Sequence, residues 1–273
     1  MKSPASLSEL LSFLDQLGVH PKKSLSQNFL IDSHVIEKTV QLSGVQSGER
    51  ILEIGPGPGA LTAALLETGA YVTVIEKDRL FAQEIHRFQN GRLEVIEADF
   101  LEWPLDHYDR VVGNLPYSIT TPILEKICES SIKTFTFMAQ KEFAARLKGK
   151  PGTKEISSLS IFIESHAAIF GAFDVSQDCF YPRPKVDSTV MRLDFTGNPD
   201  PKEFFTFVRR CYGQRRKMIT TTLKQTYPIE AIRAALVEAG ANPEARPETL
   251  TLQQWRSLFT RLCQTVAEPC ALV

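Results

Sequence analysis

The sequence lacks the features that define several large classes of protein. It contains no apolar run of about eighteen residues, which a membrane-spanning helix requires. Its five cysteines are scattered and form no C-x-x-C pair, so neither a disulfide framework nor a cysteine-based zinc site is favoured, and we expect no metal site. Charge imbalance is absent as well. Because 31 lysines and arginines nearly cancel 32 aspartates and glutamates, net charge neither requires nor excludes a polyanionic partner.

The beginning of the sequence also lacks the marks of a secretory signal. Glu9 and Asp15 interrupt its apolar segment, and no small-residue cleavage site follows. Together with the cysteine pattern, this favours a cytoplasmic protein in a reducing compartment, with no membrane partner. The sequence shows no internal repeat and no obvious dimerisation stripe, so we expect a monomer.

What is present is the composition of a globular protein of about two domains, with 273 residues of which 43% are apolar and 23% charged. Glycine and proline in "TGNPDPKE", residues 196–203, separate a region of mixed patterns from one with helical periodicity alone. We therefore predict one domain over residues 1–197, including an N-terminal helical segment 1–48, and a small all-α domain over residues 198–273.

Helix boundaries are marked by capping residues. Ser6 and Glu9 have the spacing of a capping box, and Gly18 is a stop signal, so the sequence predicts a helix over residues 6–17. A second helix is expected to begin at Asp32 and to end before Gly44. In the C-terminal domain, Thr251 is the predicted N-cap of a helix with an apolar face. That face contains Leu252, Trp255, Leu258, Phe259 and Leu262.

Residues 50–140 alternate short apolar runs with helix-like segments. Strands that are apolar along most of their length, alternating with helices, predict an α/β fold with a parallel sheet covered by helices on both faces. The predicted strands are residues 50–55, 71–76, 93–99, 108–115 and 133–140. Two further runs, 171–176 and 186–195, have no long helix between them, and we predict an antiparallel pair at the edge of the sheet.

Three glycines follow the first predicted strand in "ILEIGPGPGALT", namely Gly55, Gly57 and Gly59. The prolines between them stiffen the loop and withdraw two N–H donors, which suits a nucleoside better than a pyrophosphate. The dinucleotide fingerprint G-x-G-x-x-G would place its last glycine at Ala60. A tight strand-to-helix turn without a ligand is the alternative explanation of the glycines.

Acidic residues end the next two predicted strands. Glu76 lies about 20 residues after the glycine loop, where a carboxylate can accept both hydroxyl hydrogens of a ribose. Asp99 in "EADF" can accept an adenine amine, and Phe100 can pack on the ring. Either acid alone is equally well explained as a helix N-cap. Three consecutive strand ends with suitable groups favour a site for an adenosine-containing ligand without phosphates.

The fourth predicted strand ends in "NLPYSIT", residues 114–120. The side-chain oxygen of Asn114 and the carbonyl of Leu115 can accept the two N–H bonds of an adenine amine, and Pro116 fixes the turn. Tyr117 offers a face on which an extruded base can stack. The pattern therefore indicates methylation of a base by positioning and electrostatics, without a strong general base. An ordinary strand end with a proline turn is the alternative.

These motifs give the chain a resemblance to the bacterial 16S rRNA adenine dimethyltransferases, which form dimethyladenosine at two adjacent positions near the 3′ end of 16S rRNA. The resemblance covers nearly the whole chain. In order, the motifs are "KKSLSQNFL", "LEIGPGPGALT", "IEKD", "EADFL", "NLPYSIT", "MAQKEFAARL", "FYPRPKVDSTVMRL" and "QRRKMI". The resemblance implies a Rossmann-like class I methyltransferase fold and S-adenosylmethionine as cofactor. It also implies 16S rRNA within the immature 30S subunit as the partner, and no DNA partner. A role in 30S biogenesis is also implied.

The resemblance also implies roles for individual residues. Asn114 would lie between the cofactor and the target amine, and Phe180 in "FYPRPK" would be a second stacking platform that sandwiches the adenine against Tyr117. The alternative for Phe180 is an aromatic side chain that fills the core. The cofactor contacts expected from the motifs are Gln27, Asn28, Leu30, Gly55, Gly57, Glu76, Asp99, Phe100 and Asn114.

The distribution of charge agrees with an RNA substrate. Residues 202–224 contain seven basic residues against Glu203 alone, a local balance of plus six, and a second basic run extends from Arg146 to Lys154. Charge runs often mark only a solvated face, but two such runs fit phosphate contacts. The predicted RNA-binding residues are Arg146, Lys148, Arg209, Arg210, Arg215, Arg216 and Lys217.

Three other functions remain open from the sequence. Ser26 is more typical of the related 23S rRNA dimethylases that confer macrolide resistance, although Leu115 and the "TPIL" that follows favour the 16S enzymes. A nicotinamide oxidoreductase shares the glycine loop and Glu76 but leaves "NLPY" unexplained. A non-catalytic RNA-binding assembly factor on the same fold is disfavoured by the intact Asn114 and Tyr117.

Overall fold

The computed structural model describes residues 6–21, 27–116, 119–197 and 199–265. The chain divides into two compact units. The first contains Met1–Ala144 and Ala168–Gly197, and the second contains Ala145–Ala167 and Asn198–Val273. The second unit therefore includes a segment that precedes the expected boundary near residue 197. Over the described ranges, no helix combines the length and the apolar character that crossing a bilayer requires.

A seven-stranded sheet with the order β4-β3-β2-β5-β6-β9-β7 forms the centre of the first unit. Its strands are β2 (Arg50–Ile54), β3 (Tyr71–Glu76), β4 (Leu93–Glu97), β5 (Arg110–Asn114), β6 (Thr134–Gln140), β7 (Ala167–Val175) and β9 (Ser188–Phe195). Strands β2 to β6 pair in parallel, and β9 pairs with β6 in antiparallel fashion. The predicted parallel sheet is confirmed, and β7 and β9, the two strands predicted as an antiparallel edge pair, are neighbours at one edge of the sheet.

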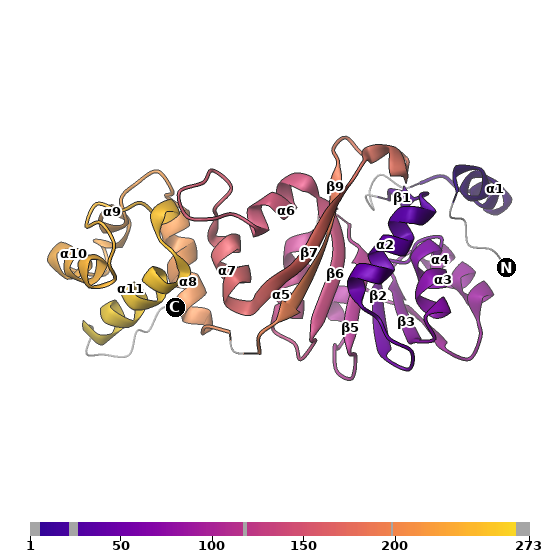
Figure 1. Ribbon diagram of the computed structural model, residues 1–273, viewed down its shortest axis with the longest axis horizontal. Helices are drawn as coiled ribbons and strands as arrows, with labels where there is room; N and C mark the ends of the chain where they lie inside the picture. The colour runs from indigo at the N-terminus through magenta and orange to yellow at the C-terminus, as the bar shows by residue number, and fades with distance from the viewer. Residues whose placement is uncertain (1–5, 22–26, 117–118, 198, 266–273) are drawn as a thin grey trace. The chain divides into compact units, whose positions relative to one another are not determined.

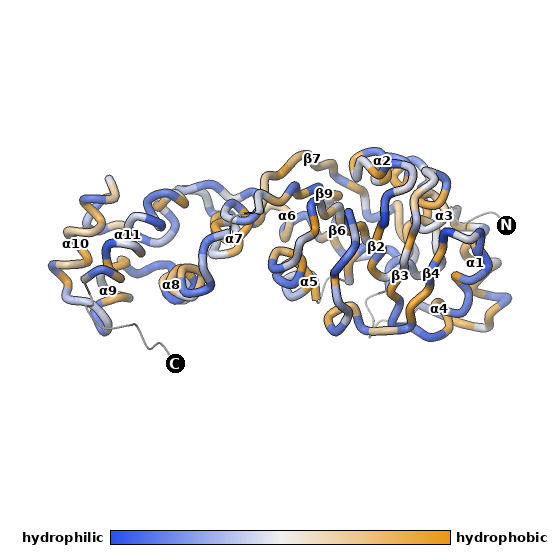
Figure 2. The backbone as a smooth tube through the Cα atoms, turned by 90° about the horizontal axis from the view of Figure 1, so that it is seen from below, coloured by the Kyte–Doolittle hydropathy of each residue, from blue (hydrophilic) through white to orange (hydrophobic). Residues whose placement is uncertain are grey.

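Helices cover both faces of this sheet, with α2 on one face and α5 on the other (Figures 1 and 2). The helices of the unit are α1 (Leu7–Leu17), α2 (Ser33–Ser43), α3 (Ala60–Glu67), α4 (Arg79–Ile85) and α5 (Thr120–Cys128), with the short 3-10 helices η2 (His86–Phe88), η3 (Phe100–Glu102) and η5 (Gln177–Cys179). Ser6 and Asp32 are N-caps that accept backbone N–H bonds, and Gly18 and Gly44 end α1 and α2 in the left-handed conformation. Both predicted helix boundaries are confirmed.

The strands are apolar because the layer of helices on each face removes both of their sides from water. Ile51, Leu52, Val74 and Val112 of the central strands are fully buried or nearly so. A two-stranded ribbon, β1 (Phe29–Leu30) with β8 (Phe180–Tyr181), pairs segments about 150 residues apart in antiparallel fashion. Since β2 to β5 are parallel, their carboxyl ends meet at one edge of the sheet, and this edge positions the candidate site.

The second unit is helical. It contains α7 (Ser158–His166), α8 (Lys202–Tyr212), α9 (Ile219–Leu223), α10 (Ile229–Glu238), η6 (Pro247–Thr249) and α11 (Leu252–Thr265), while α6 (Lys141–Leu147) crosses from the first unit to the second. The predicted apolar face of α11 is largely confirmed, since Leu252, Trp255, Leu258 and Leu262 are buried. Thr251 accepts the N–H of Gln254 at 3.2 Å, as an N-cap does.

Candidate active site

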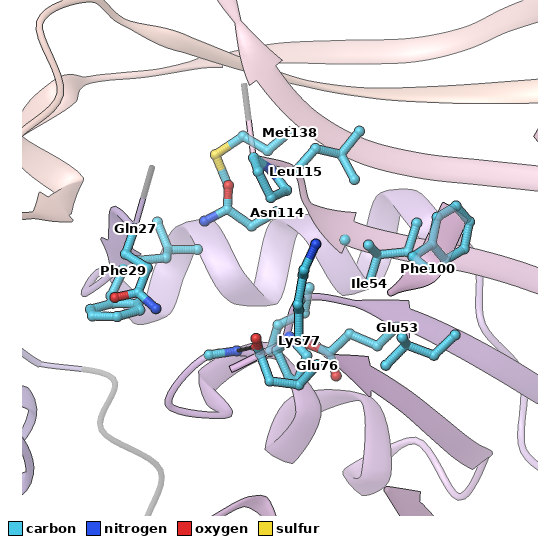
Figure 3. Close-up of a pocket in the computed structure, with 18 of the residues that line it drawn as sticks. Gln27, Phe29, Glu53, Ile54, Glu76, Lys77, Phe100, Asn114, Leu115 and Met138 are labelled. Atoms are coloured by element: carbon cyan, nitrogen blue, oxygen red, sulfur yellow. Dashed lines mark hydrogen bonds between the residues drawn. The ribbon is translucent and has the colours of Figure 1, made fainter. Parts of the chain in front are cut away.

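A cavity of about 300 Å³ lies at the carboxyl ends of β2, β3, β4 and β5. All nine residues predicted as cofactor contacts line it, namely Gln27, Asn28, Leu30, Gly55, Gly57, Glu76, Asp99, Phe100 and Asn114. Asn114 and Leu115 lie on one side of the pocket, and Glu53 and Glu76 lie on the opposite side (Figure 3). The volume falls in the range of small-molecule sites.

The glycine loop between β2 and α3 has a left-handed backbone at each of its glycines, with φ of 63° at Gly55, 52° at Gly57 and 85° at Gly59. The three positions differ in the space around them. No heavy atom lies within 4 Å of the position that a Cβ on Gly55 would take, whereas a Cβ on Gly57 would lie 3.1 Å from the ring of Phe29. A Cβ on Gly59 would collide with Phe88 and would lie 2.7 Å from Ile85. Only Gly55 therefore borders open space in the pocket.

Glu76 is fixed by backbone donors at the end of β3. Its carboxylate accepts the N–H of Gly57 at 3.1 Å and the N–H of Asp78 at 2.8 Å. The side chain is buried, and this burial raises the pKa of the carboxyl, while the two N–H bonds oppose the shift. Glu76 thus ties the glycine loop to the neighbouring strand and keeps an oxygen-rich group in the pocket.

Glu53 is a buried carboxyl that the sequence argument did not single out. It lies on β2, is 1% exposed, and its Oε2 has no hydrogen-bond partner among the described residues. Burial raises its pKa to about 8, and the charge of Glu76 acts in the same direction, while the hydroxyl of Thr62 opposes the shift. The missed signal was an acid in the middle of "ILEI", an otherwise apolar strand of the parallel sheet.

Asp99 lies at the end of β4 as the N-cap of η3, where its side chain accepts the N–H of Leu101. Its second carboxylate oxygen forms an ion pair with Lys77 at 2.8 Å, and the hydrogen bond from Lys77 keeps the pKa of Asp99 below its usual range. The acid is therefore both an N-cap, as the alternative explanation held, and a group that lines the pocket. Phe100 beside it is buried, at 4% exposed.

Asn114 is oriented by the N-terminal segment. Its Nδ2 donates to the carbonyl of Asn28 at 3.2 Å, which leaves the side-chain oxygen for another donor. The backbone N–H of Leu115 donates to Met138 at 3.3 Å, and the carbonyl of Pro116 accepts from Ile119 at 3.1 Å. The proline turn is thus part of the hydrogen-bonded start of α5. Tyr117, the predicted stacking platform, lies outside the described residues.

The N-terminal segment forms one wall of the pocket. Gln27 donates to the carboxylate of Asp78 at 3.3 Å, and the ring of Phe29 packs edge-on against Phe81 at 5.2 Å between ring centroids. Phe29 lines the pocket and was not predicted as a contact. Arg87 stacks on the ring of Phe13 in α1 and donates to the carbonyl of Pro58. Because Arg87 lies in η2, the glycine loop is supported from the side of α1 and η2.

Phe180 is not among the described residues that line the pocket. It lies in β8 opposite Leu30, is 3% exposed, and belongs to the same buried apolar cluster as Leu30 and Val35. In this structure the ring fills the core, which was the alternative for this residue. Its role as a stacking platform stays a prediction.

All seven predicted RNA-binding residues lie in the second unit, and all are exposed or partly exposed. The two basic runs are adjacent there, because Arg215 donates to the carbonyls of Thr153 and Lys154 at 3.2 and 2.9 Å. Arg215 also forms an ion pair with Glu248 at 2.9 Å. Its guanidinium is therefore engaged within the unit, whereas Arg216 and Lys217 are exposed.

Comparisons with known proteins connect this arrangement to one family of enzymes. The family model for ribosomal RNA adenine dimethylases matches residues 19–264. A ribosomal RNA small subunit methyltransferase A from Protochlamydia amoebophila is 42% identical, over 93% of this chain and 96% of its own. The protein of the same name from Chlamydia felis is 40% identical, over 95% and 96% of the two chains.

Solved structures show the same fold. The 23S rRNA methyltransferase ErmE is 30% identical and covers 86% of this chain and 99% of its own, with a TM-score of 0.68. A dimethyladenosine transferase from Plasmodium falciparum has a TM-score of 0.75, at 23% identity, over 86% of this chain and 98% of its own. The α/β fold of class I methyltransferases, with a helical C-terminal region, is confirmed.

Proposed function

Because the chain belongs to the ribosomal RNA adenine dimethylase family, we propose that it transfers methyl groups from S-adenosylmethionine to the N6 amines of two adjacent adenosines near the 3′ end of 16S rRNA. The products are dimethyladenosines, and the substrate is the RNA within an immature small subunit. The observation that carries this proposal is that Asn114 and Glu76 line the same pocket. The group proposed to bind the cofactor and the group proposed to bind the target amine thus line one cavity.

The residues that line the pocket support S-adenosylmethionine as its ligand. Gly55 borders a space with no protein atom within 4 Å of its missing Cβ, which allows a ligand to approach the backbone. Glu76 would accept the ribose hydroxyls, Asp99 would accept from the adenine amine, and Phe100 would contact the ring. Gln27, Asn28 and Leu30 would complete the wall on the N-terminal side. When bound, this cofactor supplies an electrophilic methyl group on a sulfonium.

The protein's part in the reaction is to position the target amine. The adenine nitrogen is a weak nucleophile, because its lone pair is delocalised into the ring. The side-chain oxygen of Asn114 and the carbonyl of Leu115 would accept its two N–H bonds and favour a pyramidal nitrogen whose lone pair points into the pocket. The hydrogen bond from Asn114 to Asn28 fixes the amide in this orientation before the base arrives. The proton lost after methylation goes to water or to a backbone acceptor, so no strong base is needed.

The second unit would supply the phosphate contacts. Arg209, Arg210, Arg216 and Lys217 follow one another along the end of α8 and the turn after it, and the run from Arg146 to Lys154 lies next to that turn. Basic residues in two adjacent segments fit an RNA backbone better than a small anion. Arg215 would act by holding the two segments together.

A 23S rRNA substrate is the second candidate, because ErmE matches over 86% of the chain. The identity of 42% to a small-subunit enzyme, against 30% to ErmE, supports the 16S substrate. Leu115 in the "NLPY" motif supports the same assignment.

The test is methyl transfer from labelled S-adenosylmethionine to immature 30S and 50S particles, each in a separate reaction. We expect incorporation into the 30S particle alone, a loss of at least a hundredfold in Asn114→Ala, and full activity in the control Asn90→Ala, whose side chain is exposed outside the pocket. Incorporation into 50S particles would favour the second candidate. No incorporation by a folded protein would contradict the proposal.

A further inference from the structure

Arg87 is a charged side chain that the fold largely buries beside the glycine loop. It lies in η2, and its side chain is 12% exposed. The guanidinium carbon lies over two rings, 4.3 Å from the ring centroid of Phe13 and 4.5 Å from that of Phe88. Its ion pair with Glu84 is long, at 3.8 Å. Because removing a charged group from water is costly, the other contacts of Arg87 must compensate for that cost.

The hydrogen bonds of Arg87 compensate for burial by ending on backbone carbonyls. Nη1 donates to the carbonyl of Glu84 at 3.1 Å, and Nη2 donates to the carbonyl of Pro58. Pro58 lies in the glycine loop and lines the ligand pocket. A guanidinium presents several donors in a fixed plane, so it can bond both carbonyls at once. Arg87 therefore joins η2 to the loop that borders the pocket.

The glycine loop is thus held by side chains at two neighbouring residues. Glu76 accepts the N–H of Gly57 at 3.1 Å, and Arg87 donates to the carbonyl of Pro58. Glycine has access to many backbone conformations, so a loop with three glycines loses much conformational entropy when it is ordered. A loop that is ordered before the ligand arrives binds more tightly than one that the ligand must order. The bond from Arg87 therefore contributes to the order of the loop in the free protein.

Helix α1 supports the same loop by two routes. Phe13 of α1 lies over the guanidinium of Arg87, which bonds the loop at Pro58. Two buried leucines of α1 form a cluster with Phe29, which lines the pocket, and Phe13 packs against that cluster. The ring of Phe29 in turn lies 3.1 Å from the position that a Cβ on Gly57 would take. The position of α1 is therefore coupled to two adjacent residues of the glycine loop.

We propose that Arg87 is a positioning residue for the cofactor, and that helix α1 holds Arg87 in place through Phe13. By fixing the carbonyl of Pro58, Arg87 keeps the loop in the conformation that leaves Gly55 open to a ligand. Arg87 is not among the described residues that line the pocket, so it acts through the loop and not by contact with the ligand. This inference rests on the proposed function, since it takes S-adenosylmethionine as the ligand.

The experiment compares variants of the full-length protein. Arg87→Met keeps an unbranched apolar side chain but removes the charge and the donors, Phe13→Leu removes the ring, and Phe13→Tyr keeps it. Arg92→Met is the control, because Arg92 is exposed and lies outside the pocket. Thermal unfolding first gives a temperature at which every variant is folded. At that temperature, calorimetry measures the affinity for S-adenosylmethionine, and methyl transfer to immature 30S particles gives its KM and kcat.

For Arg87→Met we expect the affinity for S-adenosylmethionine to fall about tenfold, as loss of a hydrogen bond to a charged donor can produce. KM should rise by a similar factor, while kcat changes less than about twofold, because the occupied loop regains the same conformation. Phe13→Leu should raise KM by about threefold, and Phe13→Tyr should restore the KM of the wild type. The double variant Phe13→Leu/Arg87→Met should be no weaker than Arg87→Met, because Phe13 acts through Arg87. Arg92→Met should match the wild type.

A lower melting temperature of Arg87→Met with unchanged affinity and KM would overturn this inference alone, because the role of Arg87 would then be structural only. Additive losses in the double variant, or no rescue by Phe13→Tyr, would overturn the role assigned to α1. An equal loss of affinity in Arg92→Met would also contradict the inference, since any exposed arginine would then have the same effect. Failure of the folded wild type to bind S-adenosylmethionine would overturn the proposed function as well.

Discussion

A substitution at Gly55 tests whether the glycine loop binds a ligand or only forms a tight turn. The change Gly55→Ala adds one methyl group at a left-handed residue with φ of 63°, in a position with no neighbour within 4 Å. A non-glycine residue in this conformation costs about 1–2 kcal/mol. Because nothing in the protein collides with the methyl group, we expect no further loss of stability, and a melting temperature lower by about 2–8 °C.

The affinity for the cofactor should fall far more than the stability of the fold, because the methyl group enters the space where the cofactor is proposed to contact the backbone of Gly55. We expect Gly55→Ala to lose at least a hundredfold in affinity for S-adenosylmethionine, measured by calorimetry at a temperature where the variant is folded. Gly91→Ala is the matched control, since Gly91 has φ of 80°, also has open space, and lies outside the pocket. The control should show the same loss of stability with unchanged affinity. Equal affinities for the two variants would refute the assignment of the ligand to this loop.

Three further predictions concern stability and RNA binding. Glu53→Gln should flatten the dependence of the unfolding free energy on pH, because folding raises the carboxyl pKa from its ordinary 4.5 to about 8. In urea titrations the wild type should lose up to about 4 kcal/mol of stability as pH rises from 5 to 8, whereas the variant should not. Gly59→Ala should destabilise the protein by about 2–5 kcal/mol in the absence of any ligand, because its methyl group collides with Phe88. If thermal unfolding showed the same loss of stability for Gly59→Ala as for Gly55→Ala, this prediction would be contradicted. Arg215→Lys should lower rRNA affinity and increase hydrogen exchange in residues 150–155, because one ammonium nitrogen would replace the three guanidinium nitrogens that contact Glu248 and the two carbonyls. Arg216→Ala should lower rRNA affinity without changing hydrogen exchange.

The sequence predicted those parts of the fold that depend on local signals. Ser6, Asp32 and Thr251 are caps whose partners lie three residues away, so spacing alone located the helix starts. The acids at Glu76 and Asp99 were placed in one pocket because parallel strands end at the same edge of a sheet. Both inferences needed only periodicity and one rule of sheet topology.

The parts that were missed depend on contacts between distant segments. Pairing of β1 with β8 joins segments about 150 residues apart, and it is this pairing that buries Phe180 opposite Leu30. Residues 145–167 belong to the helical unit although they precede the last strands of the sheet, because α7 packs against α8. Glu53 was missed because the apolar pattern of a strand indicates burial but does not indicate which of the buried residues faces a cavity.

The most direct test of the account is to map the methylated nucleotides. Immature 30S subunits would be incubated with the protein and S-adenosylmethionine, and nuclease fragments of their 16S rRNA would be analysed by mass spectrometry. The account predicts two adjacent N6,N6-dimethyladenosines near the 3′ end, and their absence from particles treated with Asn114→Ala. Methylation of any other position, or the same two dimethyladenosines produced by the variant, would contradict it.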